Sequence, residues 1–364
     1  MVEYLEEIKR LEDELAKTAY NKRTQMHVGL VKAKIAKLKE VQVKRSGGKK
    51  GEGYSVKKSG DATVILVGFP SVGKSTILNA ITNANSEVGS YEFTTLDVIP
   101  GTLNYKHAKI QVLDVPGIVH GAAMGVGRGK EVLAVIRNAD LAIIIIDATR
   151  PLHYDALMKE MYDSGLRLNV DVPIIKIIRK PRGGISIGTT VKLTKIDKKT
   201  IEAIFKEFRI NNADIVIRSD IDADQLIDAI EGGKIYIPAL TVLNKVDLVS
   251  KHELERLKKE LKPDICMNAN EKVDYQQKLS ELVFQKLKFI CIYCKEVGKE
   301  ADLNVPMIML LGSKIKDLCT KLHKDFITNF KFARIWGPSA KFGGQKQMLE
   351  HKMMDGDIVE VHVR

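Results

Sequence analysis

The chain has 364 residues, of which 45% are hydrophobic and 29% charged, and its formal net charge is +12. This length supports two or three domains with sizeable cores, and the composition excludes disorder as the main state. The longest unbroken aliphatic run, Leu141 to Ile146, is far shorter than the roughly 20 residues that span a bilayer. Because the charged amino terminus also has no apolar core of a secretory signal, we expect no membrane association and a cytoplasmic location.

The first 58 residues predict a basic helical hairpin followed by a linker. Apolar residues recur every three or four positions over residues 3–17 and again over 28–41, which indicates two amphipathic helices. A glycine- and lysine-rich stretch from Ser46 to Gly60 then predicts a linker. Residues 17–58 hold thirteen lysines and arginines against two glutamates, whereas the rest of the chain is nearly balanced. This local excess favours a polyanionic partner such as RNA, although lysines that merely keep a helix soluble would give the same pattern.

The middle of the chain predicts an α/β fold with a doubly wound sheet. Apolar or β-branched runs, each followed by a turn and then a helical pattern, predict strands at Ala62–Val67, Lys109–Leu113, Leu141–Ile146 and Ile237–Leu243. The interval between the last two strands is too long for a structureless loop. We therefore expect a main domain over residues 59–288 with an α/β subdomain inserted at 170–235.

The last segment, residues 289–364, predicts a small mixed α/β domain that ends in a strand from Ile358 to Val363. Its Cys291 and Cys294 have the spacing of a metal or redox pair. They lie, however, in the apolar run KFICIYC, which is typical of a strand, where positions three apart face opposite sides. The strand is the favoured interpretation.

The strongest chemical motif is Gly68-x4-Gly73-Lys74-Ser75, placed between a predicted strand and a predicted helix. Glycines allow backbone N–H groups to surround phosphate oxygens at the positive end of the helix. Lys74 is expected to bridge the β- and γ-phosphates, and the Ser75 hydroxyl to bind Mg²⁺. The expected phosphate-binding residues are Phe69, Pro70, Ser71, Val72, Gly73, Lys74, Ser75 and Thr76.

Two further segments complete the predicted phosphate site. Asp114 ends a strand and is followed by Gly117, so we expect Asp114 to hold the metal and the Gly117 N–H to contact the γ-phosphate. Between the two motifs, Tyr91 to Thr95 supplies hydroxyl groups. Thr95 is the preferred metal ligand and Thr94 the alternative, and spacing alone does not separate them.

The base is predicted from Asn244-Lys245-Val246-Asp247, which ends another strand. The Asp247 carboxylate can accept hydrogen bonds from the ring N–H and the exocyclic amino group of guanine, and adenine offers neither donor there. GTP and GDP are therefore favoured over adenine nucleotides, which argues against an ATPase of the same fold.

The sequence resembles the developmentally regulated GTP-binding (DRG) proteins, which are Obg-related, translation-factor-class P-loop GTPases. The resemblance rests on GFPSVGKST, YEFTTL, DVPGIVHGAAMGVGRG and VLNKVD, and it extends to HVGLVKAKIAKLK and FKFARIWGPSAK, so that it covers essentially the whole chain. It implies a GTPase domain with an inserted RNA-binding-like subdomain and a carboxy-terminal TGS domain of β-grasp type. It also implies association with ribosomes and, in some members, a dedicated stabilising partner protein. We expect a monomer.

Five positions either depart from related GTPases or are assigned a role by resemblance. Ile118 stands where Ras-like GTPases have a water-orienting Gln, so intrinsic hydrolysis is expected to be slow. Ser71 stands where potassium-activated relatives often have Asn, which leaves activation by K⁺ open. Asn268 and Ala269 are assigned to the last guanine-binding motif, with the Ala269 N–H as the essential donor. His120 is interpreted as a surface residue and not as a general base.

Two functions follow from these residues. The first is a GTP-hydrolysing switch whose nucleotide state alters binding to ribosomes or RNA; the glycine-rich segment after Asp114 suits such a switch. The second is an RNA-binding scaffold in which bound GTP is mainly structural. In that case the basic residues of 17–58 and of Lys176 to Lys199 would carry the function.

Overall fold

The computed structural model describes residues 2–45, 60–82, 99–114, 136, 138–269 and 272–363. The chain forms two compact units. The first contains the described residues 2–45 and 160–236, and the second contains the other described residues up to 159 together with those from 237 to 363. Among all the described residues, none of the helices combines the length and the apolar character needed to cross a bilayer.

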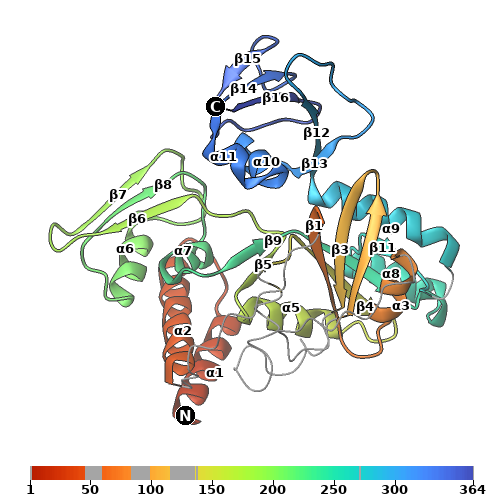
Figure 1. Ribbon diagram of the computed structural model, residues 1–364. Coiled ribbons are helices and arrows are strands. Elements are labelled where there is room, and N and C mark those ends of the chain that lie inside the picture. The colour runs from red at the N-terminus through yellow and green to blue at the C-terminus, as the bar shows by residue number, and fades with distance from the viewer. Residues whose placement is uncertain are drawn as a thin grey trace. The chain divides into compact units, whose positions relative to one another are not determined.

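The second unit is built on a six-stranded sheet in the order β11-β10-β4-β1-β3-β2 (Figure 1). The strands are β1 (Ala62–Val67), β2 (Ile99–Tyr105), β3 (Ala108–Asp114), β4 (Leu141–Asp147), β10 (Ala239–Asn244) and β11 (Ile265–Cys266). All neighbours pair in parallel except β2 and β3. Every residue of β1, β4 and β10 is buried, as the continuous apolar runs of the sequence require.

Helices cover this sheet and connect its strands. They are α3 (Lys74–Ile81), α5 (His153–Asp163), the short 3-10 helix η1 (Val246–Leu248), α8 (Lys251–Leu261) and α9 (Lys272–Leu287). On one face, Ile77 and Leu78 of α3 and Leu279 of α9 pack against the strands in one core. The doubly wound α/β sheet predicted from the sequence is confirmed.

One predicted strand is divided in two. The run Ile237–Leu243 was expected to be continuous, but β9 (Ile235–Ile237) ends before Pro238 and β10 begins after it. Proline has no N–H to donate to a sheet. The Pro238 carbonyl still accepts a hydrogen bond from the Ala142 N–H at 3.0 Å, and β9 pairs instead with β5 (Leu166–Leu168).

The C-terminal part of this unit is a separate five-stranded sheet in the order β13-β12-β16-β14-β15. It comprises β12 (Phe289–Lys295), β13 (Met307–Leu310), β14 (Phe330–Trp336), β15 (Gln345–Gln347) and β16 (Ile358–Val363), with α10 (Ile315–Leu322) and α11 (Lys324–Thr328). Cys291 packs against the core of the large sheet and Cys294 against the core of this smaller one. Both cysteines lie in β12, so the strand predicted for this run is confirmed.

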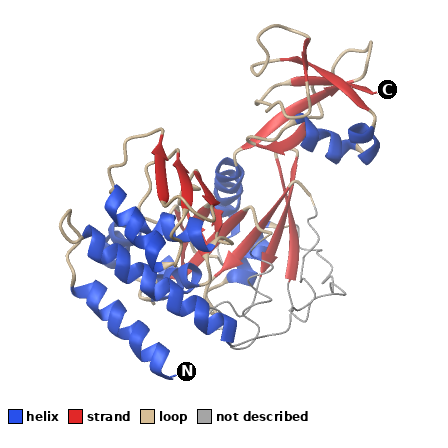
Figure 2. Ribbon diagram, turned by 90° about the vertical axis from the view of Figure 1, so that its left-hand side faces the viewer, coloured by secondary structure: helices blue, strands red, loops and turns tan. Residues whose placement is uncertain are grey.

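The first unit joins the N-terminal hairpin to the inserted segment. Besides β5 and the start of β9, its elements are α1 (Val2–Lys17), α2 (Gln25–Arg45), β6 (Ile175–Arg179), β7 (Ile185–Thr189), α6 (Lys198–Glu207), β8 (Ala213–Ile217) and α7 (Ala223–Glu231). The strands form a sheet in the order β6-β8-β7. Figure 2 shows the helices of this unit in blue and its strands in red.

The hairpin shares a core with the inserted segment, a contact that we did not predict from the sequence, where we treated residues 1–58 and 170–235 as separate regions. Ala33 of α2 is completely buried in the same core as Phe205 and Ile215 of α6 and β8. Gly29 permits this close approach, because a Cβ there would lie 2.9 Å from Thr200 Cγ2. Because Gly29 has no side chain and Ala33 has a small one, α2 can pack closely against α6.

The packing of α2 on α6 can be tested with one substitution placed at two sites. Ala33→Glu should lower the free energy of unfolding of the first unit by about 3 kcal/mol or more, because it forces a carboxylate into a filled core. Ala16→Glu makes the same change at an exposed position of α1 and should cost less than about 0.5 kcal/mol. Urea unfolding followed by circular dichroism measures both. Equal tolerance of the two substitutions would contradict the packing.

Candidate functional site

The segment between β1 and α3 is shaped by residues with positive φ. Ser71 has φ 63° and Gly73 has φ 97°, and α3 begins at Lys74 directly after Gly73. A Cβ on Gly73 would lie 2.4 Å from Asn244 Nδ2, so both the backbone conformation and the space require glycine. No side chain caps the start of α3, which leaves its first N–H groups available to a ligand.

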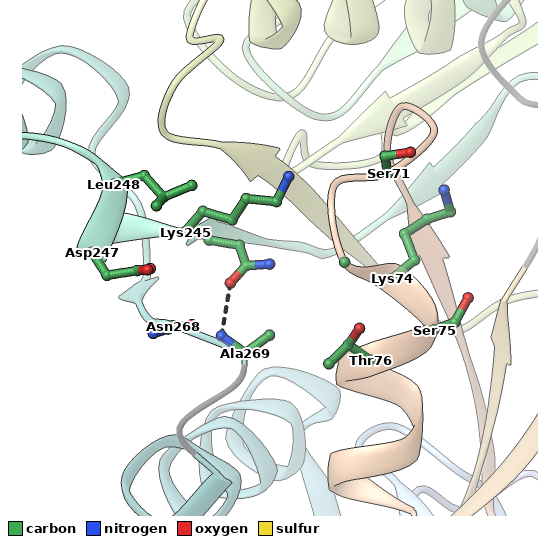
Figure 3. A pocket seen from close by; sticks show the side chains of 11 residues that line it. Ser71, Lys74, Ser75, Thr76, Lys245, Asp247, Leu248, Asn268 and Ala269 are labelled. Carbon is green, nitrogen blue, oxygen red and sulfur yellow. Dashed lines mark hydrogen bonds between the residues drawn. The ribbon is translucent and has the colours of Figure 1, made fainter.

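A cavity of about 480 Å³ opens at this point, and residues from three distant parts of the chain line it (Figure 3). They are Ser71, Gly73, Lys74, Ser75, Thr76, Asn244, Lys245, Asp247, Leu248, Asn268 and Ala269. Ten of these eleven belong to the set predicted from the sequence. The structure thus brings the predicted phosphate-binding and base-binding segments to one cavity.

At one end of the cavity, a lysine, a hydroxyl and a carboxylate come together. Lys74 Nζ donates to the carbonyl oxygens of Gly68 and Phe69, each at 3.1 Å. Burial lowers the pKa of the Lys74 ammonium, and the nearby Asp114 partly opposes that change. Ser75 Oγ donates to Asp114 Oδ2 at 2.7 Å.

Asp114 has an unused acceptor. Its Oδ1 is buried and has no hydrogen-bond partner among the residues that the structure describes. An unpaired buried carboxylate oxygen is costly unless something compensates it. Carboxylate and hydroxyl oxygens are ligands that Mg²⁺ prefers, so Ser75 and Asp114 fit a magnesium site.

The Asn244 side chain connects two of the segments that form the cavity. Its side chain is only 1% exposed; Nδ2 donates to the Val72 carbonyl at 2.7 Å, and Oδ1 accepts from the Ala269 N–H at 3.0 Å. The second bond differs from our expectation that the Ala269 N–H is a donor for guanine. That N–H is already given to Asn244, so Ala269 lines the cavity without offering this donor.

Asp147, which we did not predict from the sequence, holds Lys245 in place. Lys245 Nζ lies 2.7 Å from Asp147 Oδ2, while the other carboxylate oxygen accepts from the Thr149 N–H and hydroxyl. Burial alone would raise the pKa of Asp147, but its bonds to Lys245 and Thr149 outweigh burial and lower it. The signal was available, since Asp147 ends a buried strand at the same sheet edge as Asp114.

Leu248 was also missed. Its side chain lines the cavity and is 64% exposed, which is unusual for a leucine. It follows Asp247 directly, so an apolar residue next to the base-binding acid was the only indication in the sequence.

Several predicted residues lie elsewhere or cannot be placed. Phe69, Pro70 and Val72 do not line the cavity: the Phe69 ring stacks on His153 with centroids 4.2 Å apart, and Val72 is buried in the core. Proline also lacks an N–H for a phosphate. The predicted Thr95, with its alternative Thr94, and Gly117 lie outside the described residues, as do Ile118 and His120.

Three known protein-family descriptions match consecutive segments of the chain. Residues 63–180 match the family described as 50S ribosome-binding GTPase, and residues 182–289 match the C-terminal region of the MMR_HSR1 domain. Residues 290–363 match the TGS domain. The P-loop GTPase domain and the C-terminal TGS domain are therefore confirmed.

Relatives match over nearly the full length. An uncharacterized GTP-binding protein of Methanocaldococcus jannaschii is 52% identical over 99% of this chain and 93% of its own length. Human developmentally-regulated GTP-binding protein 2 is 42% identical over 98% of both chains. Among solved structures, a GTP-binding protein from Pyrococcus horikoshii OT3 is 17% identical, covering 83% of this chain and 100% of its own, with a TM-score of 0.40, too low to carry an argument. The similarity to the human protein over nearly the full length of both chains shows that the chain belongs to the developmentally regulated GTP-binding protein family, a family of GTPases.

Proposed function

We propose that this chain binds GTP in the cavity at the start of α3, hydrolyses it to GDP and phosphate, and acts as a nucleotide-dependent switch associated with ribosomes or RNA in translation. The observation that carries the proposal is the meeting of Lys74 and Ser75 with Asn244 and Asp247 around one cavity. The match to a family described as ribosome-binding GTPases supports the ribosomal part.

At the phosphate end, Lys74 is the residue that contacts the β- and γ-phosphates. Its ammonium group now rests on two carbonyl oxygens, which a phosphate would replace as better acceptors. Ser75 and Asp114 would hold Mg²⁺ together with Thr95 or Thr94, and the bound ion would neutralise charge on the phosphates. The Gly117 N–H is assigned to the γ-phosphate.

At the base end, Asp247 selects guanine. It is exposed in the cavity and can accept from both donors on the guanine edge. Lys245 and Leu248 line the same end, and their apolar atoms offer contact surface to a planar base. Asp147 fixes the position of Lys245, so it acts on the base through that lysine.

Hydrolysis is expected to be slow without assistance. Ile118 cannot hydrogen-bond to the attacking water, so no side chain at that position orients it. A ribosomal partner, another protein or K⁺ near Ser71 would then supply what is missing. A dedicated stabilising partner protein fits the same role.

The base assignment predicts a change of specificity. Asp247→Asn should lower affinity for GTP by at least about 100-fold, because two charge-assisted hydrogen bonds are lost, and should favour xanthosine triphosphate, whose edge matches an amide. Titration with fluorescent nucleotides measures both affinities. Asp302→Asn, which changes an exposed acid in the loop between β12 and β13, is the control. Unchanged GTP selectivity in Asp247→Asn would contradict the assignment.

The position of Lys245 generates a second prediction. Asp147→Asn should weaken GTP binding about 10-fold, because the ion pair that orients Lys245 is lost, while turnover at saturating GTP stays within about 2-fold. The same substitution at exposed Asp155 should change neither quantity. A fall in saturated turnover with unchanged affinity would show that Asp147 does not act through the base end.

The GTP-hydrolysing switch and the RNA-binding scaffold predict different effects of ribosomes on the rate of GTP hydrolysis. We expect slow hydrolysis in sodium and an increase of at least about 10-fold when ribosomes are added, since a missing catalytic element can be worth roughly 10³ to 10⁵ in rate. Phosphate release measured in Na⁺ and in K⁺, each with and without ribosomes, separates the contributions. If ribosomes neither accelerate hydrolysis nor bind the GTP and GDP forms differently, the scaffold replaces the switch.

A further inference from the structure

The first unit contains a second hollow, of about 550 Å³, which we name the hairpin groove. One wall is the turn between α1 and α2, with Tyr20, Lys22 and Gln25. The other is the segment from the end of β7 to the start of α6, with Lys192, Lys195 and Lys198. Two basic stretches that are about 170 positions apart in the sequence thus face one groove.

The four groove lysines carry available charge. Lys22, Lys192, Lys195 and Lys198 are exposed, and within the described part of the chain none of them forms an ion pair. One carboxylate, that of Asp197, also lines the groove and keeps its negative charge near Lys22, while its Oδ1 accepts from the Thr200 N–H at 2.7 Å as the cap of α6. The four lysines outnumber this single acid of the lining. The groove is therefore positively charged.

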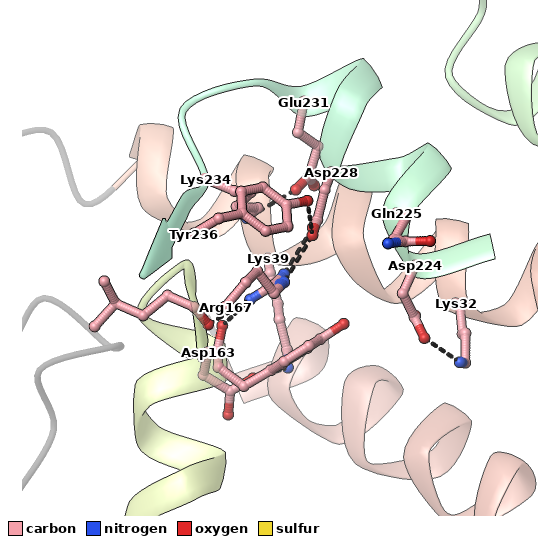
Figure 4. A network of polar contacts seen from close by, with 12 residues as sticks. Lys32, Lys39, Asp163, Arg167, Asp224, Gln225, Asp228, Glu231, Lys234 and Tyr236 are labelled. Carbon is pink, nitrogen blue, oxygen red and sulfur yellow. Dashed lines mark hydrogen bonds and ion pairs between the residues drawn. The ribbon is translucent and has the colours of Figure 1, made fainter. Parts of the chain in front are cut away.

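Lysines on α2 behave differently, as Figure 4 shows for two of them. Lys32 Nζ lies 2.5 Å from Asp224 Oδ2, and Lys39 Nζ lies 2.9 Å from Asp163 Oδ1. Lys37 Nζ lies 3.3 Å from Glu207 Oε1. These three lysines are partly neutralised inside the unit, in contrast to the four lysines of the groove.

The groove also presents an oriented aromatic ring. Tyr20 is 60% exposed, yet its hydroxyl donates to the Lys195 carbonyl at 3.0 Å. Gln25 Nε2 donates to the same carbonyl and to the Tyr20 hydroxyl, so the two walls are tied together. A fixed, exposed ring beside lysines provides a surface on which an unpaired base can stack.

We propose that the hairpin groove binds single-stranded RNA, with the four lysines on backbone phosphates and Tyr20 stacked on a base. This rests on the RNA association proposed above and assigns a site to it. Phosphates need charge without fixed geometry, which lysine supplies as a point charge. An acidic peptide would use the same lysines but would gain little from the exposed ring.

The first test compares two variants that lose the same charge. The groove variant carries Lys22→Gln, Lys192→Gln, Lys195→Gln and Lys198→Gln, and the control carries Lys251→Gln, Lys259→Gln, Lys262→Gln and Lys324→Gln at other exposed positions. Both are used as full-length chains, because removing the hairpin would uncover the core around Ala33. An unchanged circular dichroism spectrum and urea unfolding curve verify that each variant is folded, and retained GTP binding verifies the nucleotide cavity of the second unit.

Fluorescence anisotropy with a labelled 20-nucleotide oligo(U), over a range of KCl concentrations, gives the affinity and its salt dependence. The groove variant should lose at least about 10-fold in affinity, and its slope of log affinity against log salt should fall by up to about 3, since each phosphate contact on a single strand contributes about 0.7. The control variant should stay close to the unmodified chain.

Tyr20 provides an independent arm. Tyr20→Ala should weaken oligo(U) binding by about 5-fold or more, and Tyr20→Phe, which keeps the ring, by less than about 2-fold. Equal losses in the groove and control variants, or no loss in either, would overturn the groove as the site. Labelled poly-glutamate that binds as tightly as oligo(U) and is lost in the groove variant would identify an acidic protein partner instead. Absence of oligo(U) binding by the unmodified chain would overturn the underlying RNA association.

Discussion

The buried amide of Asn244 is the interaction on which the nucleotide cavity depends. It reaches the Val72 carbonyl on one side and the Ala269 N–H on the other, so one side chain links the loop before α3 to both base-end segments. Removing it would leave two buried backbone groups unpaired, which is far costlier than losing an exposed hydrogen bond. Gly73 belongs to the same constraint, because any side chain there would collide with the amide. Phosphate end and base end are therefore held at a fixed separation.

The sheet explains why these groups meet. Strands β1, β3, β4 and β10 run parallel, so their carboxyl ends lie at one edge. That edge delivers the P-loop, Asp114, Asp147 and Asn244 in turn. Ligands of open α/β sheets bind at this edge, and here each strand contributes one element of the site. Asn244 and Asp147 are direct partners in the register of β10 and β4, which places Lys245 within reach of the Asp147 carboxylate.

Local patterns predicted the parts of the structure that local physics determines. The apolar runs of β1, β4 and β10 indicated buried strands, because the strands of a parallel sheet that is covered on both faces consist almost entirely of apolar residues. The P-loop was predictable because its local backbone conformation requires glycine. Three features required knowledge of distant contacts: the pairing of Lys245 with Asp147, the use of the Ala269 N–H by Asn244, and the packing of α2 on α6. The division of the strand at Pro238 could have been predicted from the sequence, because proline has no N–H to donate to a neighbouring strand.

Charge shows the same distinction between sequence and structure. A count along residues 17–58 assigns most of the net charge to the hairpin, but Lys32 meets Asp224, which lies 192 positions away, and so escapes any local count. Partly exposed ion pairs of this kind contribute about 1 kcal/mol each, so burial of Ala33 and the close approach at Gly29 hold α2 in place more than the pairs do. What the pairs change is the electrostatics: they reduce the positive potential at Lys32, Lys37 and Lys39, whereas Lys22 and Lys195 line the groove at the turn before α2. A polyanion should therefore be attracted to the lysines at this turn more strongly than to the paired lysines of α2.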